Sequence, residues 1–263
     1  ICIHNPELLV LVPIIKTLSI FFKTKIIYEP HELEVCKTSC KDKKLKATIY
    51  FLLEMINIPF CNLVVLVSNS IEKWYQQSYK TTKTFVIPNI PYRKYIDKEN
   101  FNYLKKRTNI RDSLKISEDK ILFLYQGLLS RSRGLLFLID IFKQYENKNV
   151  VFALMGGGED ELLIKQIADK NPNIFFHDYV DPRYLIDFSS TADYGMSFVP
   201  QKLKPCLSYD YGVSNKFYEY LMSGLKVIVS NNFIEQSILV NKHNLGFVCE
   251  GNEIKLMKLI DSI

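Results

Sequence analysis

The stretch 121-ILFLYQGLLSRSRGLLFLIDIFKQYENKNVVFALM-155 decides the fold, because two short apolar runs flank a helix-like segment. Residues 121–126 and 150–155 are the kind of short apolar run that is typical of buried strands. Residues 134–145 between them have the apolar spacing of an amphipathic helix. The succession of strand, helix and strand predicts an open parallel sheet that is covered by helices.

The same alternation continues to residue 230. Further strands are expected at 173–178, 194–199 and 226–230, and further helices at 160–169, 182–190 and 215–223. This α/β pattern predicts a Rossmann-like domain over residues 119–263.

The first half of the chain has a less complete version of the pattern. Strands are expected at 25–29, 63–68 and 84–88, and helices near 8–22 and 47–55. The apolar run 8–22 is interrupted by Pro13 and Lys16 and is shorter than the roughly 20 residues that a bilayer requires, so it predicts a buried helix. The segment "IPNIP" at 87–91 breaks regular structure. We therefore expect a first domain at 1–90, a linker at 91–118 and a second domain at 119–263.

Composition excludes several classes of protein. The chain has 263 residues, of which 48% are hydrophobic and 24% charged, so it is neither disordered nor collagenous. Its six cysteines are scattered without the second close pair that a zinc site would want, which favours reduced thiols in the cytoplasm.

Charge is unevenly distributed along the chain. Residues 1–115 contain 19 Lys+Arg and 10 Asp+Glu, a net charge of +9, which leaves −3 for the remainder. Two basic clusters stand out: Lys41, Lys43, Lys44 and Lys46, and Lys105, Lys106, Arg107 and Arg111. Either cluster could contact phosphates or the anionic inner surface of a membrane, or could be a solvated face.

Two segments of the second half could bind a phosphorylated ligand. In "YQGLLSRSRG", residues 125–134, a glycine-containing loop places Arg131 and Arg133 at the start of a helix, where free N–H groups also favour anions. A turn with two solvated arginines is the alternative. In "SNKFYEYLMSG", residues 214–224, Asn215 and Glu219 lie on one face of a short helix. Glu219 could accept hydrogen bonds from sugar hydroxyls, or the pair could face solvent.

Two other segments have competing interpretations. In "IIYEPHELE", residues 26–34, His31 follows a strand and is suited to handle a proton, although a structural role is the alternative. Its neighbouring carboxylates need not converge, so no metal site is predicted there. "MGGGEDE", residues 155–161, matches part of a dinucleotide fingerprint, with Asp178 where a ribose-binding acid would lie. A nicotinamide-dependent oxidoreductase is therefore one alternative, and a tight turn explains the glycines equally well.

Taken in order, several strings resemble glycosyltransferase family 4, whose members are common in bacterial envelope polysaccharide synthesis. They are "IHNPELL", "IIYEPHEL", "VVLVSNSI", "FVIPNIP", "YQGLLSRSRGL", "LMGGGE", "DYVDPRYL" and "SNKFYEYLMSGLKVIVS". The resemblance implies the GT-B fold, in which two Rossmann-like domains with parallel sheets face a cleft. It further implies that the second domain binds a nucleotide-sugar donor and the first binds an acceptor.

The resemblance also assigns roles to individual residues. Glu219 matches the second Glu of the family's Glu-x7-Glu motif and would bind the donor ribose. His31, Arg133 and Lys216 would be catalytic, with His31 beside the reacting sugar and the two cations at the donor phosphates. The remaining donor-binding residues would be Gly127, Arg131, Tyr179, Val180 and Asn215. The resemblance implies no metal and no cofactor.

The chain departs from the family pattern at identifiable places. Tyr211 stands eight residues before Glu219, where the family has its first Glu, and Leu128 replaces a frequent Arg. Relative to the family, the chain is expected to be a piece that lacks the opening strands and the final helices.

The resemblance implies a hexosyltransferase-type enzyme that transfers a sugar, with retention of anomeric configuration, to a glycan or lipid-linked acceptor. It would act in the cytoplasm, with peripheral contact to the inner membrane as an added expectation and no nucleic-acid partner. A degenerate sugar-nucleotide-binding or scaffold protein remains an alternative because of Tyr211.

Overall fold

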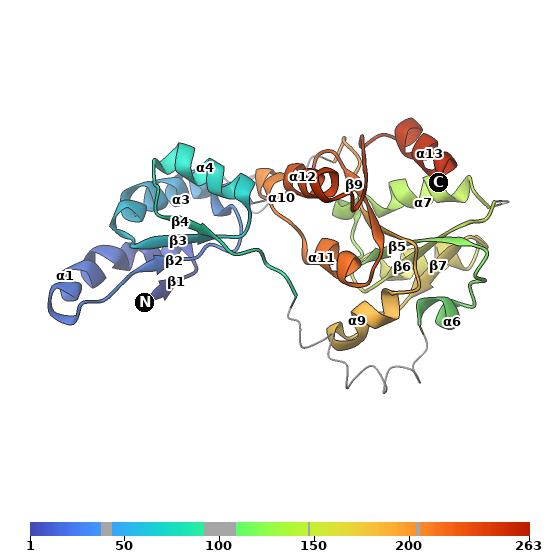
Figure 1. Ribbon diagram of the computed structural model, residues 1–263, viewed down its shortest axis with the longest axis horizontal. Coiled ribbons are helices and arrows are strands. Elements are labelled where there is room, and N and C mark those ends of the chain that lie inside the picture. The colour runs from blue at the N-terminus through green and yellow to red at the C-terminus, as the bar shows by residue number, and fades with distance from the viewer. Residues whose placement is uncertain (38–43, 92–108, 147, 204–205) are drawn as a thin grey trace. The chain divides into compact units, whose positions relative to one another are not determined.

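The computed structural model describes residues 1–37, 44–91, 109–146, 148–203 and 206–263, which form two compact units (Figure 1). Unit 1 comprises Ile1–Asn89, Pro205–Val213 and Phe233–Gln236. Unit 2 comprises Ile90–Lys204, Ser214–Asn232 and Ser237–Ile263. Two later segments thus belong to the first unit, which a division at one linker does not predict.

Unit 2 contains a parallel sheet in the strand order β10-β9-β8-β5-β6-β7. Its strands are β5 (Ile121–Gln126), β6 (Val150–Met155), β7 (Ile174–His177), β8 (Tyr194–Ser197), β9 (Lys226–Ser230) and β10 (Gly246–Cys249). The chain order reverses between β5 and β8, which is the Rossmann arrangement. The expected α/β class is therefore confirmed, and the expected strands of this half are present.

Helices precede, connect and follow these strands along the chain. They are α6 (Ile110–Leu114), η5 (Arg131–Arg133), α7 (Leu135–Lys143), α8 (Glu161–Ala168), α9 (Pro182–Ser189), α11 (Asn215–Met222), α12 (Ile234–His243) and α13 (Glu253–Ser262). Because helices cover the sheet, every residue of β6 is buried. The rings of Phe123, Phe142 and Phe152 pack together, with the last two 4.4 Å apart at their centroids.

Unit 1 contains a smaller parallel sheet in the order β1-β2-β3-β4. Its strands are β1 (Cys2–Ile3), β2 (Ile27–Tyr28), β3 (Leu63–Leu66) and β4 (Thr84–Val86). Its helices are η1 (Pro6–Leu11), α1 (Val12–Phe22), η2 (Glu34–Cys36), α3 (Lys44–Asn57), η3 (Ile58–Phe60), α4 (Asn69–Tyr79) and α10 (Leu207–Tyr211). The strand β1 and the helix α4 were not expected from the sequence.

The later segments of unit 1 bind at the start of α4. Ser68, its N-cap, donates a hydrogen bond from Oγ to the carbonyl of Tyr211 at 2.6 Å. The buried carboxylate of Glu235 accepts from the backbone N–H groups of Asn69 and Ser70 at 3.3 and 3.0 Å. These contacts join residues about 140 to 170 positions apart in the chain into one unit.

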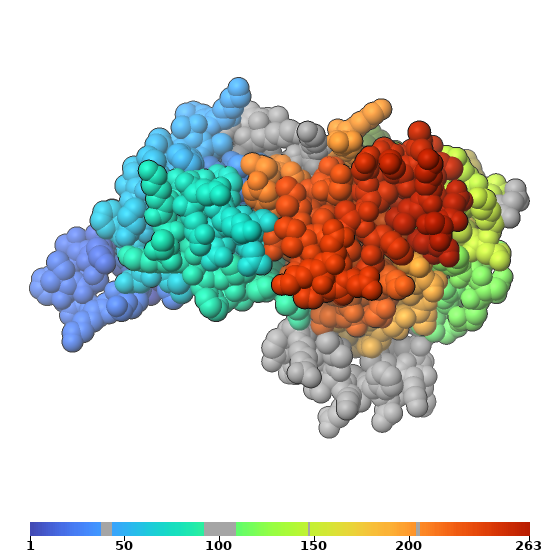
Figure 2. All heavy atoms as spheres, turned by 45° about the horizontal axis from the view of Figure 1, so that its top comes forward, coloured from blue at the N-terminus to red at the C-terminus, as the bar shows by residue number. Residues whose placement is uncertain are grey.

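The expectation of a buried helix at residues 8–22 is wrong. Val12 is the only buried residue of α1, whereas Ile14, Leu18 and Phe21 are exposed, Phe21 by 78%. The atoms of α1, in blue, lie at the surface of unit 1 in Figure 2. Apolar composition predicted burial, but only one narrow stripe of this helix contacts the rest of the unit. Within the described residues, no helix is long and apolar enough to span a membrane.

The interpretation of Arg111 as part of an exposed basic cluster is also wrong. Its side chain is only 4% exposed, and it donates hydrogen bonds to the carbonyls of Thr191, Ser117 and Lys120 and to the carboxylate of Asp193. Arg111 therefore anchors α6, in the expected linker, to unit 2. Its expected partners Lys105, Lys106 and Arg107 lie outside the described residues, as do Lys41 and Lys43 and most of the expected linker, residues 92–108.

Candidate functional site

A polar constellation lies at the carboxyl end of β5, next to the point where the strand order of unit 2 reverses. Gln126, the last residue of β5, is buried and donates a hydrogen bond from Nε2 to the carboxylate of Glu219 at 2.9 Å. Its Oε1 accepts a hydrogen bond from Ser189 in α9 at 2.9 Å. Ligands of open α/β sheets bind at this reversal point, so Glu219 is held where a ligand is expected.

Tyr220 anchors the helix that carries Glu219. Its hydroxyl accepts a hydrogen bond from the backbone N–H of Gln126 at 2.9 Å. Its ring packs on Gly195 in β8, where an added Cβ would lie 2.2 Å from the ring. Because only glycine leaves room for this ring, Gly195 sets how closely α11 approaches the sheet.

Two cations accompany the carboxylate. The Lys216 ammonium lies 4.2 Å from the centroid of the Tyr125 ring, within the range of a cation–π contact. Burial, and secondly the positive charge of Arg133, lower the pKa of Lys216 to about 7, while Glu219 acts in the opposite direction. Burial raises the pKa of Glu219, and Gln126 and Lys216 partly offset that effect. The positive charges of Lys216 and Arg133 repel each other, and a bound anion would offset that repulsion.

The loop after β5 carries Arg133 and Gly127. Gly127 has a φ of +126°, and an added Cβ would meet no atom within 4 Å, so the space beside its backbone is open. Gly134, which follows Arg133, has a φ of +70°, and an added Cβ would lie 2.4 Å from Pro200. Arg131 behaves differently, because it pairs with Asp160 at 3.4 Å and its side chain is 77% exposed.

The start of α11 has an unsatisfied hydroxyl. Ser214 occupies the N-cap position, but its side chain does not cap the helix. Its Oγ is buried and has no hydrogen-bond partner among the residues that the structure describes. Asn215 follows as the first, exposed residue of the helix. A ligand oxygen at this helix start could accept from the Ser214 hydroxyl.

Tyr179 and Val180 follow β7 and Asp178, at the same edge of the parallel sheet as the carboxyl end of β5. Tyr179 is 67% exposed, and Val180 is half-buried. Asp181 then caps α9 by accepting from the N–H of Arg183. The structure thus leaves the Tyr179 ring accessible at this edge.

The glycine run after β6 has a structural reason of its own. A Cβ added at Gly156 would lie 2.0 Å from the carbonyl oxygen of Gly127. A Cβ added at Gly158 would lie 2.4 Å from the carbonyl oxygen of Leu129. The run therefore packs its backbone against the loop that follows β5. Asp178 is exposed after β7, at the edge of the sheet, and nothing in this packing requires a dinucleotide.

His31 lies in unit 1, exposed beyond the carboxyl end of β2. Its ring stacks on that of His4, with centroids 5.1 Å apart and an interplanar angle of 1°. Tyr211 also belongs to unit 1, where it packs against the hydrophobic core. The ring of Tyr211 therefore serves packing.

The sequence did not predict Gln126, His4 or the unpaired hydroxyl of Ser214 as parts of a site. Gln126 could have been found as the polar residue that ends an otherwise apolar strand. His4 could have been found from its alternate spacing with Cys2 ahead of an apolar helix. The unpaired state of Ser214 has no counterpart in the sequence, because it depends on what surrounds the hydroxyl.

Residues 106–263 match the family described as "Glycosyl transferases group 1". No curated protein matches the chain. Among solved structures, the chain is similar to Anabaena Alr3699/HepE, solved in complex with UDP, with a TM-score of 0.67, 16% identity and coverage of 99% of this chain and 68% of that chain.

Two further structures show the same likeness. Sucrose-phosphate synthase from Thermosynechococcus elongatus has a TM-score of 0.65 and 16% identity over 94% of this chain and 61% of that chain. WaaG, described as a glycosyltransferase involved in lipopolysaccharide biosynthesis, has a TM-score of 0.59 and 14% identity over 95% of this chain and 71% of that chain. At these identities the likeness shows the fold, which is GT-B.

Proposed function

We propose that this chain, which belongs to the glycosyl transferases group 1 family, transfers a sugar from a nucleoside-diphosphate donor. The acceptor would be a glycan or a lipid-linked saccharide, and the anomeric configuration would be retained, as the resemblance to family 4 implies. The observation that carries the proposal is the constellation of Glu219, Lys216 and Gln126 at the reversal point of the unit 2 sheet.

Each group in the constellation suits one part of such a donor. The Glu219 carboxylate, oriented by Gln126, can accept hydrogen bonds from the two ribose hydroxyls. Lys216 and Arg133 supply positive charge for the diphosphate, and the free N–H groups at the start of α11 add to it. The open space beside Gly127 allows a ligand to approach the backbone closely.

The same cations would assist the chemical step. Breaking the bond between the sugar and the diphosphate leaves negative charge on the departing oxygen. Charged groups already positioned there stabilise that charge without reorganisation, which is where catalysis gains most. The proposed reaction therefore needs no metal at the donor, and His31 would be the residue of unit 1 beside the reacting sugar.

A ligand screen tests donor binding. Thermal unfolding of the chain would be measured with UDP, GDP, dTDP, CDP, NAD and NADP, because a ligand that binds the native state raises its stability. We expect a shift with one nucleoside diphosphate, reduced in Glu219→Ala and unchanged in the control Glu253→Ala, whose residue begins α13. A shift with NAD or NADP alone would contradict the proposal.

Turnover tests catalysis separately from binding. In Arg133→Ala we expect a slower chemical step, measured as kcat for donor hydrolysis or sugar transfer. Tyr211 favours a second candidate, a sugar-nucleotide-binding protein without turnover, because its ring packs in unit 1 and offers no carboxylate to the donor sugar. Donor binding with no transfer to any saccharide acceptor by the full-length protein would select this candidate.

We also propose peripheral contact with the inner face of the membrane through α1 and α3. Like α1, the helix α3 has exposed apolar side chains, at Leu45, Ile49, Leu52 and Ile56, which recur on one face of the helix. The only acidic residue of these two helices is Glu54, which is buried, while Lys16 and Lys44 are exposed. Apolar side chains flanked by exposed lysines suit a surface of anionic lipid.

Vesicle binding tests this contact. We expect the chain to co-sediment with anionic phospholipid vesicles, less strongly at high salt, and Phe21→Asp to weaken binding. The control Leu162→Asp changes a residue of α8 in unit 2 that is similarly exposed, and should bind as the unmodified chain does. Equal binding by Phe21→Asp and Leu162→Asp, or no binding by the unmodified chain, would contradict the proposal.

A further inference from the structure

Two pairs of potential metal ligands lie on neighbouring strands of unit 1. The first strand begins at Cys2 and is followed directly by His4, and the second is followed by Glu29 and then His31. The strands are parallel, with Ile3 opposite Tyr28. Successive side chains of a strand point to opposite faces. Because Ile3 and Tyr28 point into the core, the two pairs share the other face of the sheet.

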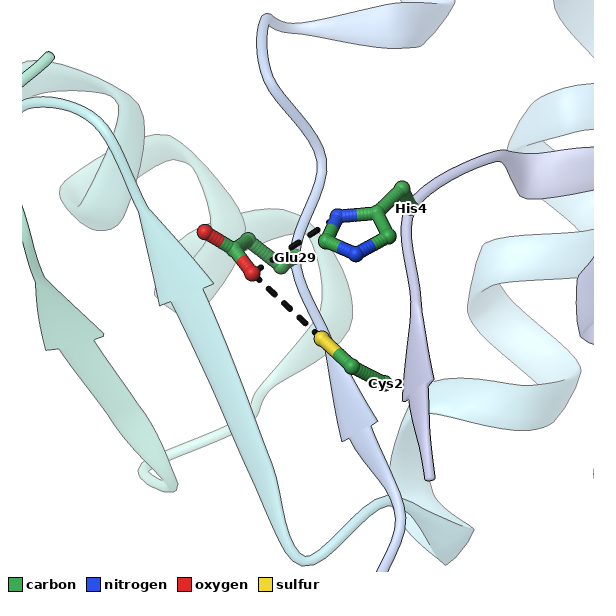
Figure 3. A group of neighbouring side chains, drawn as sticks. All are labelled: Cys2, His4 and Glu29. Carbon is green, nitrogen blue, oxygen red and sulfur yellow. Dashed lines mark hydrogen bonds and ion pairs between the residues drawn. The ribbon is translucent and has the colours of Figure 1, made fainter.

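Three of these side chains converge (Figure 3). The Cys2 thiol donates to Oε2 of Glu29 at 3.3 Å, and Nδ1 of His4 lies 3.6 Å from the same oxygen. The three donor atoms all lie within 4.8 Å of one another. Around a tetrahedral zinc ion, bond lengths of about 2.0 to 2.3 Å place donor atoms about 3.3 to 3.6 Å apart. The two separations from Glu29 fall in this range, and the Cys2 and His4 donor atoms, within 4.8 Å of each other, need to move closer by no more than about 1.5 Å.

We propose that Cys2, His4 and Glu29 bind a divalent transition-metal ion of the zinc class. One sulfur, one nitrogen and one oxygen donor form a set that favours zinc-like ions over magnesium or calcium, which prefer oxygen alone. On binding, the thiol gives up its proton and the Cys2 thiolate, the His4 imidazole and the Glu29 carboxylate become ligands. Three protein ligands leave one position of a tetrahedral ion open to solvent or to another ligand.

The surroundings of the three residues are compatible with metal entry. Cys2 and His4 are exposed, so an ion can reach them from solvent. The ring of His31 stacks on one face of the His4 ring and helps to fix its orientation. His31, which the proposed function places beside the reacting sugar, stacks on His4 but is not one of the three ligands. Metal binding is measured without a donor, so it is tested separately from the proposed transferase function.

Cobalt is a suitable probe because its thiolate complexes absorb in the near ultraviolet and its tetrahedral complexes absorb visible light. The reduced, metal-free chain would be titrated with Co²⁺ and then with Zn²⁺ as a competitor. We expect one equivalent of Co²⁺ to produce both absorptions and Zn²⁺ to abolish them. Cys2→Ser should remove the thiolate absorption, and Glu29→Gln and His4→Gln should each weaken binding by about tenfold or more.

Two controls distinguish metal binding at these residues from binding at another cysteine or at the terminal amine. Cys36→Ser changes another partly accessible cysteine and should bind as the unmodified chain does. A chain with extra residues before Ile1 should also bind, since the terminal amine is not part of the site. Urea unfolding followed by Trp74 fluorescence, which reports on unit 1, would show that the variants are folded. The proposal fails if no thiolate absorption appears, if Cys2→Ser retains it, or if the extended chain loses it.

Discussion

The charge of Lys216 depends on what occupies the candidate site. Burial and the neighbouring guanidinium of Arg133 lower the pKa of its ammonium to about 7, so near neutrality the empty site holds a mixture of charged and neutral Lys216. A diphosphate between the two cations would restore the charge by raising this pKa. Donor binding should therefore take up a proton, and the uptake gives the affinity a pH dependence.

The first prediction follows from the direction of this shift. Below about pH 7 Lys216 is already protonated and a nucleoside-diphosphate sugar binds at full affinity. As pH rises above about 7, binding must first protonate the amine, so the affinity should fall by up to about tenfold per pH unit. A UDP-sugar is the suitable probe because its diphosphate does not titrate in this range. Isothermal titration calorimetry in buffers of different ionisation enthalpy would measure both affinity and proton uptake.

Lys216→Arg is the matched variant. Arginine keeps its charge across this range, so its profile should be flat between pH 6.5 and about 8.5. The same slope in both proteins would assign the pH dependence to another group.

At the scale of elements, α3 packs in an unusual way. It buries Glu54 and exposes leucines and isoleucines, the reverse of the ordinary pattern. The carboxylate accepts hydrogen bonds from the hydroxyls of Tyr28, Tyr75 and Tyr79 at 2.6, 2.7 and 2.5 Å. Three donors from β2 and α4 thus converge on one acceptor and fix the position of α3 in unit 1. Burial is the main influence on Glu54 and raises its pKa.

The second prediction concerns the pH dependence of this network. Because the folded state raises the pKa of Glu54 above its ordinary value of 4.5, its contribution to stability is full below that value and is lost as pH rises through the folded pKa. Glu54→Gln cannot ionise but keeps a hydrogen-bond acceptor, so it should gain stability relative to the unmodified chain as pH rises above 4.5. Glu54→Leu leaves three buried hydroxyls without an acceptor and should lose about 3 kcal/mol or more.

Urea unfolding followed by tryptophan fluorescence measures these changes. Trp74 is the only tryptophan of the chain, and its ring lies 5.6 and 5.5 Å from those of Tyr75 and Tyr79. Its emission therefore reports on unit 1 at this network. A constant stability difference between Glu54→Gln and the unmodified chain across pH would exclude ionisation of Glu54 as the cause.

The third prediction concerns the turn after β6. Gly156 has a φ of +143°, and an added Cβ would lie 2.0 Å from a backbone carbonyl. Gly156→Ala should therefore destabilise unit 2 by about 3 kcal/mol or more. Gly157→Ala is the control, because its added Cβ would meet only the end of the flexible Glu161 side chain, at 3.2 Å. Circular dichroism during urea unfolding would compare them, and equal losses would show that close backbone packing is not the reason for the glycines.

At the scale of the whole molecule, the chain returns twice from unit 2 to unit 1. Unit 1 is completed by 205–213 and 233–236, which follow most of the unit 2 sequence. The contact that best defines this arrangement is Glu235 at the start of α4, where a buried carboxylate meets the positive end of a helix. Stability of unit 1 should therefore depend on residues that lie far from it in sequence.

The fourth prediction tests that dependence. Glu235→Ala leaves the N–H groups of Asn69 and Ser70 without their acceptor, and we expect unit 1 to lose about 2 kcal/mol, measured by the urea midpoint of Trp74 fluorescence. Glu250→Ala changes an exposed acidic residue and should leave that midpoint unchanged. An unaltered midpoint in Glu235→Ala would mean that unit 1 is stable without this contact.

The sequence by itself determined the fold class and most of unit 2. The strands at 121–126, 150–155 and 226–230 were predicted with the bounds that the structure shows, because burial on both faces of a parallel sheet leaves a continuous apolar run. The place of Glu219 on a short helix could also be predicted, since helix spacing and caps are local signals.

Only the tertiary structure decided which distant side chains meet. Gln126 contacts Glu219 because the strand order of unit 2 brings α11 to the end of β5, and Cys2 contacts Glu29 because two strands align in one register. Burial was misjudged at α1 and Arg111 for the same reason. An apolar helix remains exposed where nothing covers it, and a buried arginine is stable where carbonyls surround it. Composition and spacing describe the segment itself, whereas contacts and burial depend on the elements that pack against it.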